Sequence, residues 1–254
     1  MPNTDLRQRK AGRQRTACIG EKIYLTHAGV DGNITCMIDL HTHTLLSDGE
    51  LLPSELVRRA QVIGYTAIAL TDHVDSSNID FVLPRIVKVS KILNKDWDIF
   101  VIPGVEITHA PLKEIPQLVK FARKNGAEII VVHGETIMEP VIPGTNRCAI
   151  EAGCDIVSHP GKIKEEDASL AAKRGVVLEI TTRKSHSPAN AHVYAMAKTS
   201  GAKMVINTDT HSPDDLISDS DAEKFLTSLG MSAAEVDTVF GNSKDIVKRI
   251  RSKR

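Results

Sequence analysis

Two histidines and an aspartate in one short stretch of the chain have the residue types and the spacing of a metal site. His41 and His43 are separated by one residue, and Asp48 follows five residues after His43. Side chains two residues apart on an extended chain point to the same side. Since a Zn–N bond is only about 2.0–2.1 Å long, both imidazoles can bind one cation. A pair of polar histidines in a loop fits this motif equally well when it is taken alone.

Seven short apolar segments predict strands, and further ligand-type residues follow them. The predicted strands are Met37–Leu40, Ala67–Leu70, Phe100–Val105, Ile129–Val132, Asp155–Val157, Val176–Ile180 and Lys203–Ile206. The residues at their carboxyl ends include His41, His43, Asp72, His73, Glu106, His133, His159, Asp209 and His211. Six of the ten histidines therefore follow a strand. A chance scatter of histidines would not track strand ends, so the pattern favours a metal cluster.

Helical segments with turn signals at their ends separate these strands. Pro53 and Gly64 bound Ser54–Ile63, and Pro116 and Asn125 bound Gln117–Lys124. This alternation predicts a parallel sheet covered by helices, and seven strands fit a closed α/β barrel better than two half-sheets. Because parallel barrel strands open their carboxyl ends onto one face, the ligand residues are expected to meet at one rim. Three final helices, Asp214–Gly230, Ser232–Phe240 and Lys244–Ile250, are expected to cover the barrel and close its far side.

Composition sets limits on the partners of the chain. Its 254 residues suit one or two domains, and 32 basic residues balance 32 acidic ones, so no global field favours nucleic acid or a membrane. Basic residues gather near both ends: Arg7, Arg9, Lys10, Arg13, Arg15, Lys248, Arg249, Arg251, Lys253 and Arg254. We interpret them as solvated, partly disordered tails rather than an RNA-binding element. Residues 1–36 are expected to form an N-terminal extension, and residues 37–254 the compact domain.

Cysteine usage and hydropathy indicate a cytoplasmic protein. The four cysteines, Cys18, Cys36, Cys148 and Cys154, include no C-x-x-C pair and suggest no disulfide framework, so we expect reduced thiols. No apolar run approaches the roughly 18 residues of a membrane helix, and no signal-peptide core follows the basic N-terminus. Gly-x-Ser-x-Gly, P-loop and Gly-x-Gly-x-x-Gly motifs are also absent, which disfavours serine hydrolase and nucleotide-loop chemistry.

Taken together, the motifs resemble those of the polymerase and histidinol phosphatase (PHP) superfamily. They are His-Thr-His-x4-Asp-Gly at 41–49, Thr-Asp-His at 71–73, Pro-Gly-x-Glu at 103–106, Val-His at 132–133, Ser-His-Pro at 158–160 and Asp-x-His at 209–211. They occur in the family's order over about 70% of the chain, from Met37 to Asp215. The resemblance implies a distorted (β/α)7 TIM-like barrel with three divalent metal ions at the strand carboxyl ends.

The resemblance also implies a ligand set for each ion. His41, His43, Glu106 and Asp209 would hold the first ion; Glu106, His133 and His159 the second; Asp48, His73 and His211 the third. Many members of the family have histidine at the position of Asp48, so the third site is the one expected to differ in occupancy. Asp72 would either orient an imidazole or cap a buried turn. Imidazole and carboxylate ligands suit Zn, Mn or Fe, and the sequence does not choose among them.

Such a centre suits phosphoester hydrolysis. Three divalent ions exceed the charge of Asp48, Glu106 and Asp209 by three, which favours a phosphate dianion, and two ions about 3.5–4 Å apart can activate water at neutral pH. His41, His43, Glu106, Asp209 and His211 would be the catalytic residues. Basic loop residues on the same face, Arg183, Arg147, Lys184 and His186, are candidates to contact phosphate, with Arg183 first. Glu179 is more often a structural carboxylate than a substrate contact.

The leading hypothesis is a metal-dependent phosphatase for a small phosphomonoester, similar to histidinol-phosphate phosphatase. A nuclease or nucleoside-bisphosphate phosphatase of the same fold is the second hypothesis, with nucleic acid as a less favoured substrate. The third is a PHP module that serves as a scaffold without turnover. The presence of ligand-type residues at all nine positions argues against the third hypothesis.

Overall fold

The fold is an α/β barrel, and we describe residues 37–254 of a computed structural model. The expected N-terminal extension, residues 1–36, lies outside the described residues. The strands are β1 (Ile38–Asp39), β2 (Ala67–Leu70), β3 (His73–Val74), β4 (Phe100–Ile107), β5 (Ile129–His133), β6 (Ile156–Ser158), β7 (Val177–Thr181) and β8 (Met204–Asn207). Every ladder between them is parallel, in the order β1-β2-β4-β5-β6-β7-β8, and the short β3 pairs with β4. The predicted barrel is thus confirmed, with β3 as an addition.

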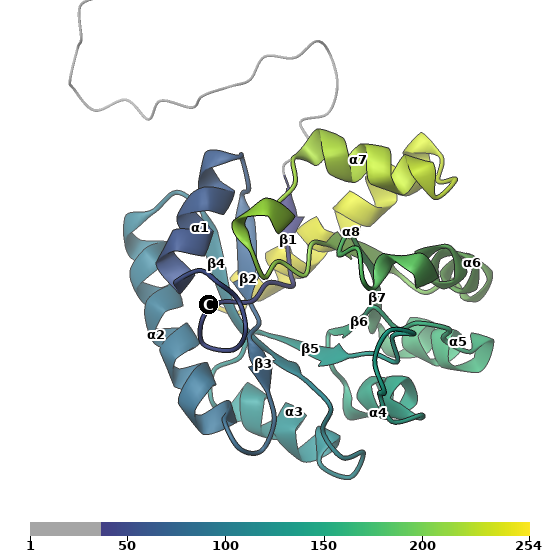
Figure 1. The fold of residues 1–254 in the computed structure, drawn as a ribbon, viewed down its shortest axis with the longest axis horizontal. Helices are drawn as coiled ribbons and strands as arrows, with labels where there is room; N and C mark the ends of the chain where they lie inside the picture. The colour runs from purple at the N-terminus through teal and green to yellow at the C-terminus, as the bar shows by residue number, and fades with distance from the viewer. Residues whose placement is uncertain (1–36) are drawn as a thin grey trace, which may run out of the picture. The chain divides into compact units, whose positions relative to one another are not determined.

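Helices surround the strands on the outside of the barrel (Figure 1). They are α1 (Pro53–Val62), α2 (Ile79–Asp96), α3 (Ile115–Lys124), α4 (Thr145–Ala152), α5 (Glu165–Arg174), α6 (Asn190–Ser200), α7 (Asp219–Ser228) and α8 (Ala233–Arg251), with 3-10 turns at Ser187–Ala189 and Pro213–Asp215. Proline opens α1 and α3 near their first turns, as the sequence predicted. The predicted helix Asp214–Gly230 is instead a short 3-10 turn followed by α7.

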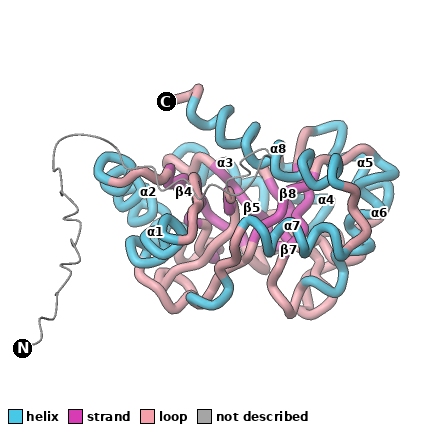
Figure 2. The backbone as a smooth tube through the Cα atoms, turned by 90° about the horizontal axis from the view of Figure 1, so that it is seen from above, coloured by secondary structure: helices cyan, strands magenta, loops and turns pink. Residues whose placement is uncertain are grey.

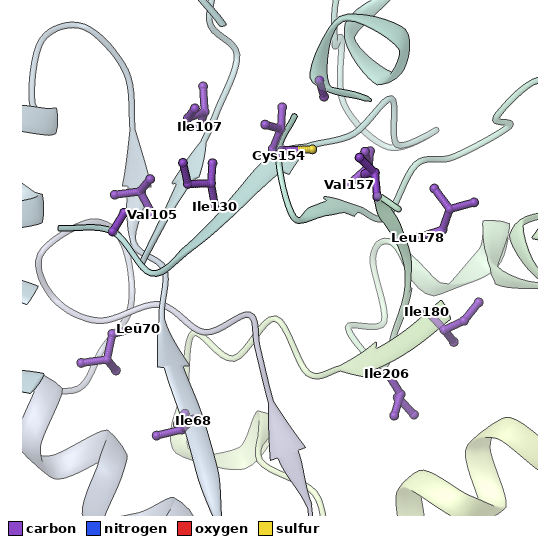
Figure 3. Close-up of a cluster of buried hydrophobic side chains, with 14 of the residues drawn as sticks. Ile68, Leu70, Val105, Ile107, Ile130, Cys154, Val157, Leu178, Ile180 and Ile206 are labelled. Carbon is purple, nitrogen blue, oxygen red and sulfur yellow. The ribbon is translucent and has the colours of Figure 1, made fainter. Parts of the chain in front are cut away.

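Side chains alternate between two cores along the barrel strands. On β2, Ala67 and Ala69 belong to the interior of the barrel, whereas Ile68 and Leu70 pack outside it against the helices. Figure 3 shows outward side chains of this kind around the ring of strands, from Ile68 to Ile206. This period of two is the ordinary geometry of an extended chain. It means that each strand supplies one face to the helix layer and one face to the barrel interior.

The amino end of the barrel interior is closed by α8. Ile246, Val247 and Ile250 are each at most 7% exposed and pack against interior residues of β1, β2 and the other strands. The sequence predicted closure by C-terminal helices but divided this segment into two, at Gly241. The structure corrects this: α8 continues through Gly241, and a Cβ there would meet no neighbour within 4 Å.

The C-terminal basic residues are not the disordered tail that the sequence suggested. Arg249 and Arg251 lie in the last turn of α8, and the Arg254 guanidinium pairs with Glu128 at 2.6 Å. Arg251 and Arg254 also both lie over the ring of Phe100, with each Cζ 4.5 Å from the ring centroid. The end of the chain is therefore attached to the barrel.

Side chains bridge the place where β1 and β8 meet. Backbone pairing between these strands is limited to one bridge, Thr42 with Thr210, within residues 37–254. The Leu40 N–H donates to Asn207 Oδ1 at 2.9 Å, and the Thr208 hydroxyl donates to Asp39 Oδ2 at 2.6 Å. Because most of the backbone ladder between β1 and β8 is missing, the barrel is nearly rather than fully closed. The side-chain bonds replace part of that ladder.

Two further expectations concern membranes and cysteines. Among the helices of residues 37–254, none combines the length and the hydropathy that a membrane span requires. Cys148 and Cys154 are free thiols, as expected, and Cys18 and Cys36 lie outside the described residues. Burial raises the pKa of the Cys154 thiol strongly, so this sulfur belongs to the core.

The closure by α8 predicts a large loss of stability when its buried face is trimmed. Ile246→Ala should lower the free energy of unfolding by about 2–5 kcal/mol, because it removes buried methyl groups and leaves a cavity beneath the barrel. Urea titration followed by circular dichroism measures this change. Val62→Ala, at a position that is 66% exposed, is the control and should change stability by less than about 0.5 kcal/mol. Equal effects of the two changes would contradict the assigned role of α8.

Candidate metal centre

Inward-facing positions change from apolar to polar at the carboxyl end of the barrel. On β5 the inward series runs Ile129, Val131, His133, and on β7 it runs Val177, Glu179, Thr181. The register of the sheet puts His73 beside Glu106, and His133 beside Ser158. All nine predicted ligand residues lie at this end, and every one except Asp48, His73 and His211 is at most 3% exposed. The predicted convergence is therefore found.

The first group lies at the β1–β8 seam. The Nε2 atoms of His41 and His43 are 3.0 Å apart, although β1 ends at Asp39 and is shorter than predicted. His41 Nε2 lies 3.2 Å from Glu106 Oε1, and His43 Nε2 lies 3.2 Å from Asp209 Oδ1. These are the four residues that the family resemblance implied for one ion.

A second group gathers at the more open side of the rim. The Asp48 carboxylate lies 3.2 Å from His211 Nε2 and 3.5 Å from His73 Nε2. Potential ligand atoms of His43, Asp48, His73 and His211 all lie within 4.8 Å of one another. The Asp48 side chain is 57% exposed, so this group faces solvent.

A third group surrounds His133 and includes residues that the sequence reasoning did not assign to metal. Ligand atoms of His133, His159 and His186 fall within 4.8 Å of one another, and so do those of His109, His133 and Glu139. Glu139 Oε2 lies 3.0 Å from His109 Nε2 and 3.2 Å from His133 Nε2, and Glu139 Oε1 lies 3.5 Å from His186 Nε2. Glu139 lies six residues past the end of β5, in a loop, and His109 follows β4, which extends two residues beyond the predicted strand, so the predicted strand ends did not reveal them.

The loop that carries Glu139 is firmly held at its base. Glu135 Oε1 accepts hydrogen bonds from the backbone N–H groups of Gly144 and Asn146, at 3.0 and 2.9 Å. Gly161 has φ +60° and approaches Glu135 so closely that a Cβ would lie 1.8 Å from its carbonyl oxygen. Thr136, in the same loop, lies 2.8 Å from His186 Nδ1 through its hydroxyl. The hydroxyl leaves His186 Nε2 directed toward Glu139.

Two buried carboxylates, Glu179 and Asp72, form hydrogen bonds with the ligand residues or with the segments that carry them. Glu179 Oε1 lies 2.8 Å from His41 Nδ1 and accepts from the Asn207 amide, while its other oxygen accepts from the His159 N–H. It therefore fixes the orientation of His41, which agrees with its predicted structural role. Asp72 accepts from the Thr44 N–H and the Ser47 hydroxyl. Of the two roles predicted for Asp72, these bonds favour the buried turn cap.

The predicted phosphate contacts differ in position. Arg183 Nη1 lies 2.8 Å from His211 Nδ1 and donates to the Asp209 carbonyl at 3.2 Å, so its guanidinium is at the rim. Arg147 lies in α4 rather than in a loop, and it pairs with Asp167 at 2.6 Å and with Glu151 at 3.3 Å. Lys184 is exposed in the loop after β7. The structure brings Arg183 to the ligand residues and gives Arg147 other partners.

Backbone strain is concentrated at the centre. Within residues 37–254, the non-glycine residues with positive φ are His109 (49°), His159 (25°) and Asp209 (54°). A left-handed conformation costs a non-glycine residue free energy and persists where surrounding contacts impose it. All three residues belong to the groups described above. The contacts within these groups therefore impose the strained backbone, which directs the three side chains toward the centre.

Two buried imidazoles have lowered pKa values that suit cation binding. Burial and the neighbouring imidazoles lower the pKa of His43 and of His159 well below the ordinary value, which keeps both rings neutral with a lone pair available. Burial, with Glu106 and Glu179 nearby, raises the pKa of Asp209 to about 7. His43 Nδ1, His159 Nδ1 and Asp209 Oδ1 are buried without a hydrogen-bond partner. A divalent cation would satisfy Asp209 Oδ1 and accept the lone pairs of the two neutral rings, so the residues present fit a metal centre.

Fold and site together define an α/β barrel with groups of potential metal ligands at the carboxyl ends of its strands. The model of the PHP domain family matches residues 39–244, and the chain belongs to this family. An uncharacterized protein of Methanocaldococcus jannaschii is 46% identical over 215 residues, which are 84% of this chain and 99% of that protein. A 5'-3' exoribonuclease of Salmonella typhimurium is 38% identical over 78 residues, which are 31% of this chain and 25% of the enzyme.

Solved structures support the fold. A chain of archaeal ribonuclease P with mature tRNA matches with a TM-score of 0.64 at 18% identity, over 83% of this chain and 90% of that one. The histidinol phosphate phosphatase of Lactococcus lactis, solved with zinc, L-histidinol and phosphate, matches with a TM-score of 0.51 at 18% identity, over 84% and 93%. The predicted PHP membership and distorted barrel are confirmed.

The contacts of Glu139 predict a role in holding a cation near His133. Glu139→Gln keeps the size of the side chain but removes a charge that a divalent cation would neutralise, so cation affinity should fall by about 10–100-fold. Competition with a metal indicator, with metal content of the purified variant as a second readout, measures the loss. Glu151→Gln, on the outer surface of α4, is the matched control. Unchanged affinity and metal content in Glu139→Gln would show that the carboxylate only bonds the imidazoles.

Proposed function

We propose that this protein is a metal-dependent phosphoesterase that hydrolyses a small phosphomonoester. The observation that carries the proposal is the convergence of imidazoles and carboxylates from β1, β3, β4, β5 and β8 at one rim, at ligand distances from one another. Membership of the PHP family supports it, and the Lactococcus lactis phosphatase of the same fold was solved with zinc and phosphate.

The first group of side chains is buried, the Asp48 group is open, and the third group combines buried imidazoles with the exposed His109 and Glu139. His41, His43, Glu106 and Asp209 would hold a cation in the interior, and Asp48, His73 and His211 would hold one at the surface. Bound divalent cations would polarise a phosphoryl oxygen and lower the pKa of water. Zn, Mn and Fe all suit these ligands. A phosphate group would enter from the Asp48 side, where the rim is exposed.

Charge limits what the site attracts. Three divalent ions exceed the charge of the predicted ligand carboxylates by three, but Glu139 and Glu179 add two further negative charges at the centre. The surplus then falls to one. Arg183 adds one positive charge at the rim, and the Asp215 carboxylate, 3.8 Å from its guanidinium, adds one negative charge. Arg183 therefore becomes a main contributor to phosphate binding, and its planar guanidinium suits two phosphate oxygens.

Cleavage of RNA ends is the second candidate function. Its support is the identity to the Salmonella typhimurium 5'-3' exoribonuclease, which is 38% over 31% of this chain. The same rim would then receive a terminal nucleotide in place of a small ester. Both functions use one centre and differ in the leaving group.

Activity of the metal-loaded protein tests the proposal. Protein depleted of metal and reloaded with Zn, Mn or Fe should release phosphate from small phosphomonoesters, including histidinol phosphate. His41→Ala and Asp209→Ala should reduce the rate more than about 100-fold, because each removes a ligand of the interior group. His192→Ala, on α6 outside the three groups, should retain the rate, with circular dichroism as a check on folding. Absence of hydrolysis at full loading refutes the proposal, and cleavage confined to 5'-phosphorylated oligonucleotides selects the second candidate.

Removal of the Arg183 guanidinium should mainly weaken substrate binding. Arg183→Ala should raise KM for the phosphomonoester about 10–100-fold, since a charged hydrogen bond contributes about 1.5–3 kcal/mol. Arg183→Lys should recover part of the loss, because it restores the charge without the planar pair of donors. Steady-state kinetics separates KM from kcat, and Arg58→Ala on α1 is the control. An unchanged KM in Arg183→Ala would remove this residue from the substrate site.

A further inference from the structure

Two hollows lie at the amino end of the barrel, away from the metal centre. The larger has a volume of about 680 Å³, and the basic residues that line it are Lys91, Arg123, Arg249, Lys253 and Arg254. The smaller has a volume of about 300 Å³, and its basic residues are Lys244, Lys248 and Arg251. Ile38 and Ala67, at the starts of β1 and β2, also line the smaller hollow, which fixes its place at the amino end. Figure 2 shows α8 and the C-terminus on one side of the barrel.

The hollows are strongly basic in a chain of zero net charge. Eight lysines and arginines line them, whereas Glu128 and Asp155 are the acidic residues among the lining side chains. Both carboxylates are already paired: Asp155 with Arg123 at 2.5 Å and with Arg249 at 3.2 Å, and Glu128 with Arg254 at 2.6 Å. The face therefore keeps a formal surplus of six positive charges, and its acids serve to hold its arginines in place.

One arginine from each hollow stacks on Phe100. Arg251, which lines the smaller hollow, and Arg254, which lines the larger, both lie over its ring at 4.5 Å. Stacking and ion pairing reduce the freedom of these long side chains before any ligand arrives, so less entropy is lost on binding. By contrast, Lys91, Lys248 and Lys253 form no ion pair with any other residue in 37–254, and all three are exposed.

We propose that this face, defined by the eight basic residues of the two hollows, binds the phosphate backbone of a nucleic acid. Its cations extend along α8 from Lys244 to Arg251 and reach α2 and α3, an area suited to several phosphates rather than one. Among residues 37–254, no aromatic side chain lines either hollow, and two arginines already stack on the nearby Phe100. Contacts are thus to the backbone, and binding is independent of sequence.

The proposal is separate from the proposed function. The basic face lies at the amino ends of the strands, whereas the ligand residues of the metal centre lie at the carboxyl ends. Binding can therefore be measured in EDTA, where no cation is available for hydrolysis. A protein without phosphoesterase activity would still be expected to bind, so failure of one proposal leaves the other standing.

Salt-dependent binding of a fluorescein-labelled 20-nucleotide RNA by the full chain tests the proposal. Fluorescence anisotropy in EDTA should show saturable binding whose logarithm falls linearly with the logarithm of the salt concentration. The double variant Lys91→Glu/Lys253→Glu, and separately Lys248→Glu, should weaken binding, the double variant by more than about tenfold. Each lost phosphate contact should reduce the salt slope by about 0.7. Lys173→Glu on α5, exposed and lining neither hollow, is the matched control and should bind as the wild type does.

Three outcomes would overturn the proposal. One is that the variants of the hollows bind RNA with the affinity and salt slope of the wild type. Another is that Lys173→Glu weakens binding as much as Lys248→Glu, which would indicate a response to net charge alone. The last is that polyglutamate competes as well as an RNA of equal charge, which would identify an acidic protein surface as the better partner. Thermal melting of each variant verifies that the exposed substitutions leave the fold intact.

Discussion

The rest of the structure depends on the alternation of side chains along parallel strands that close on themselves. Every second residue of each strand must fill a narrow interior, and the same positions, continued toward the carboxyl end, must face whatever lies at the rim. In β5 this gives Ile129 and Val131 as packing residues and His133 as a ligand residue. The same alternation therefore selects both the residues that pack in the apolar interior and the polar residues that face the rim. The apolar end is sealed by α8, which allows the polar end to remain open without exposing the core.

The seam between β1 and β8 shows how closure and chemistry are coupled. A full ladder there would require regular extended backbone through residues 39–43, but His41 and His43 need to turn their rings toward Glu106 and Asp209. Asp39 and Asn207 supply side-chain hydrogen bonds in place of the missing backbone ones. Asn207 also donates to Glu179, which holds His41 Nδ1. The groups that join the two edges of the sheet are thus the groups that aim the first histidine, and a change at the seam would alter both stability and ligand geometry.

Much of this could be predicted from the sequence because it depends on local pattern. Short apolar runs located the strands to within a few residues, and residues at their ends located the rim. Three features were not predicted correctly, each for a physical reason. Glu139 lies in the middle of the loop after β5, where no period marks a side chain that turns back toward the barrel. α8 was divided because Gly241 weakens a helix, whereas tertiary contacts such as that of Asn242 with the Met204 carbonyl stabilise it. Arg147 was assigned to the rim from its loop-like neighbours, yet Gly144 caps α4 and directs Arg147 to Asp167.

A net charge of zero conceals a strong separation of charge along the barrel axis. The carboxyl end gathers Asp48, Glu106, Glu139 and Asp209, and the amino end gathers the eight basic residues of the two hollows. β4 alone has eight residues, about 26 Å of extended chain, whereas the Debye length at physiological ionic strength is about 8 Å. The basic face therefore does little to attract a phosphorylated substrate to the distant centre. It acts on molecules that touch it directly, so the two ends of the barrel are best understood as independent sites on one rigid frame.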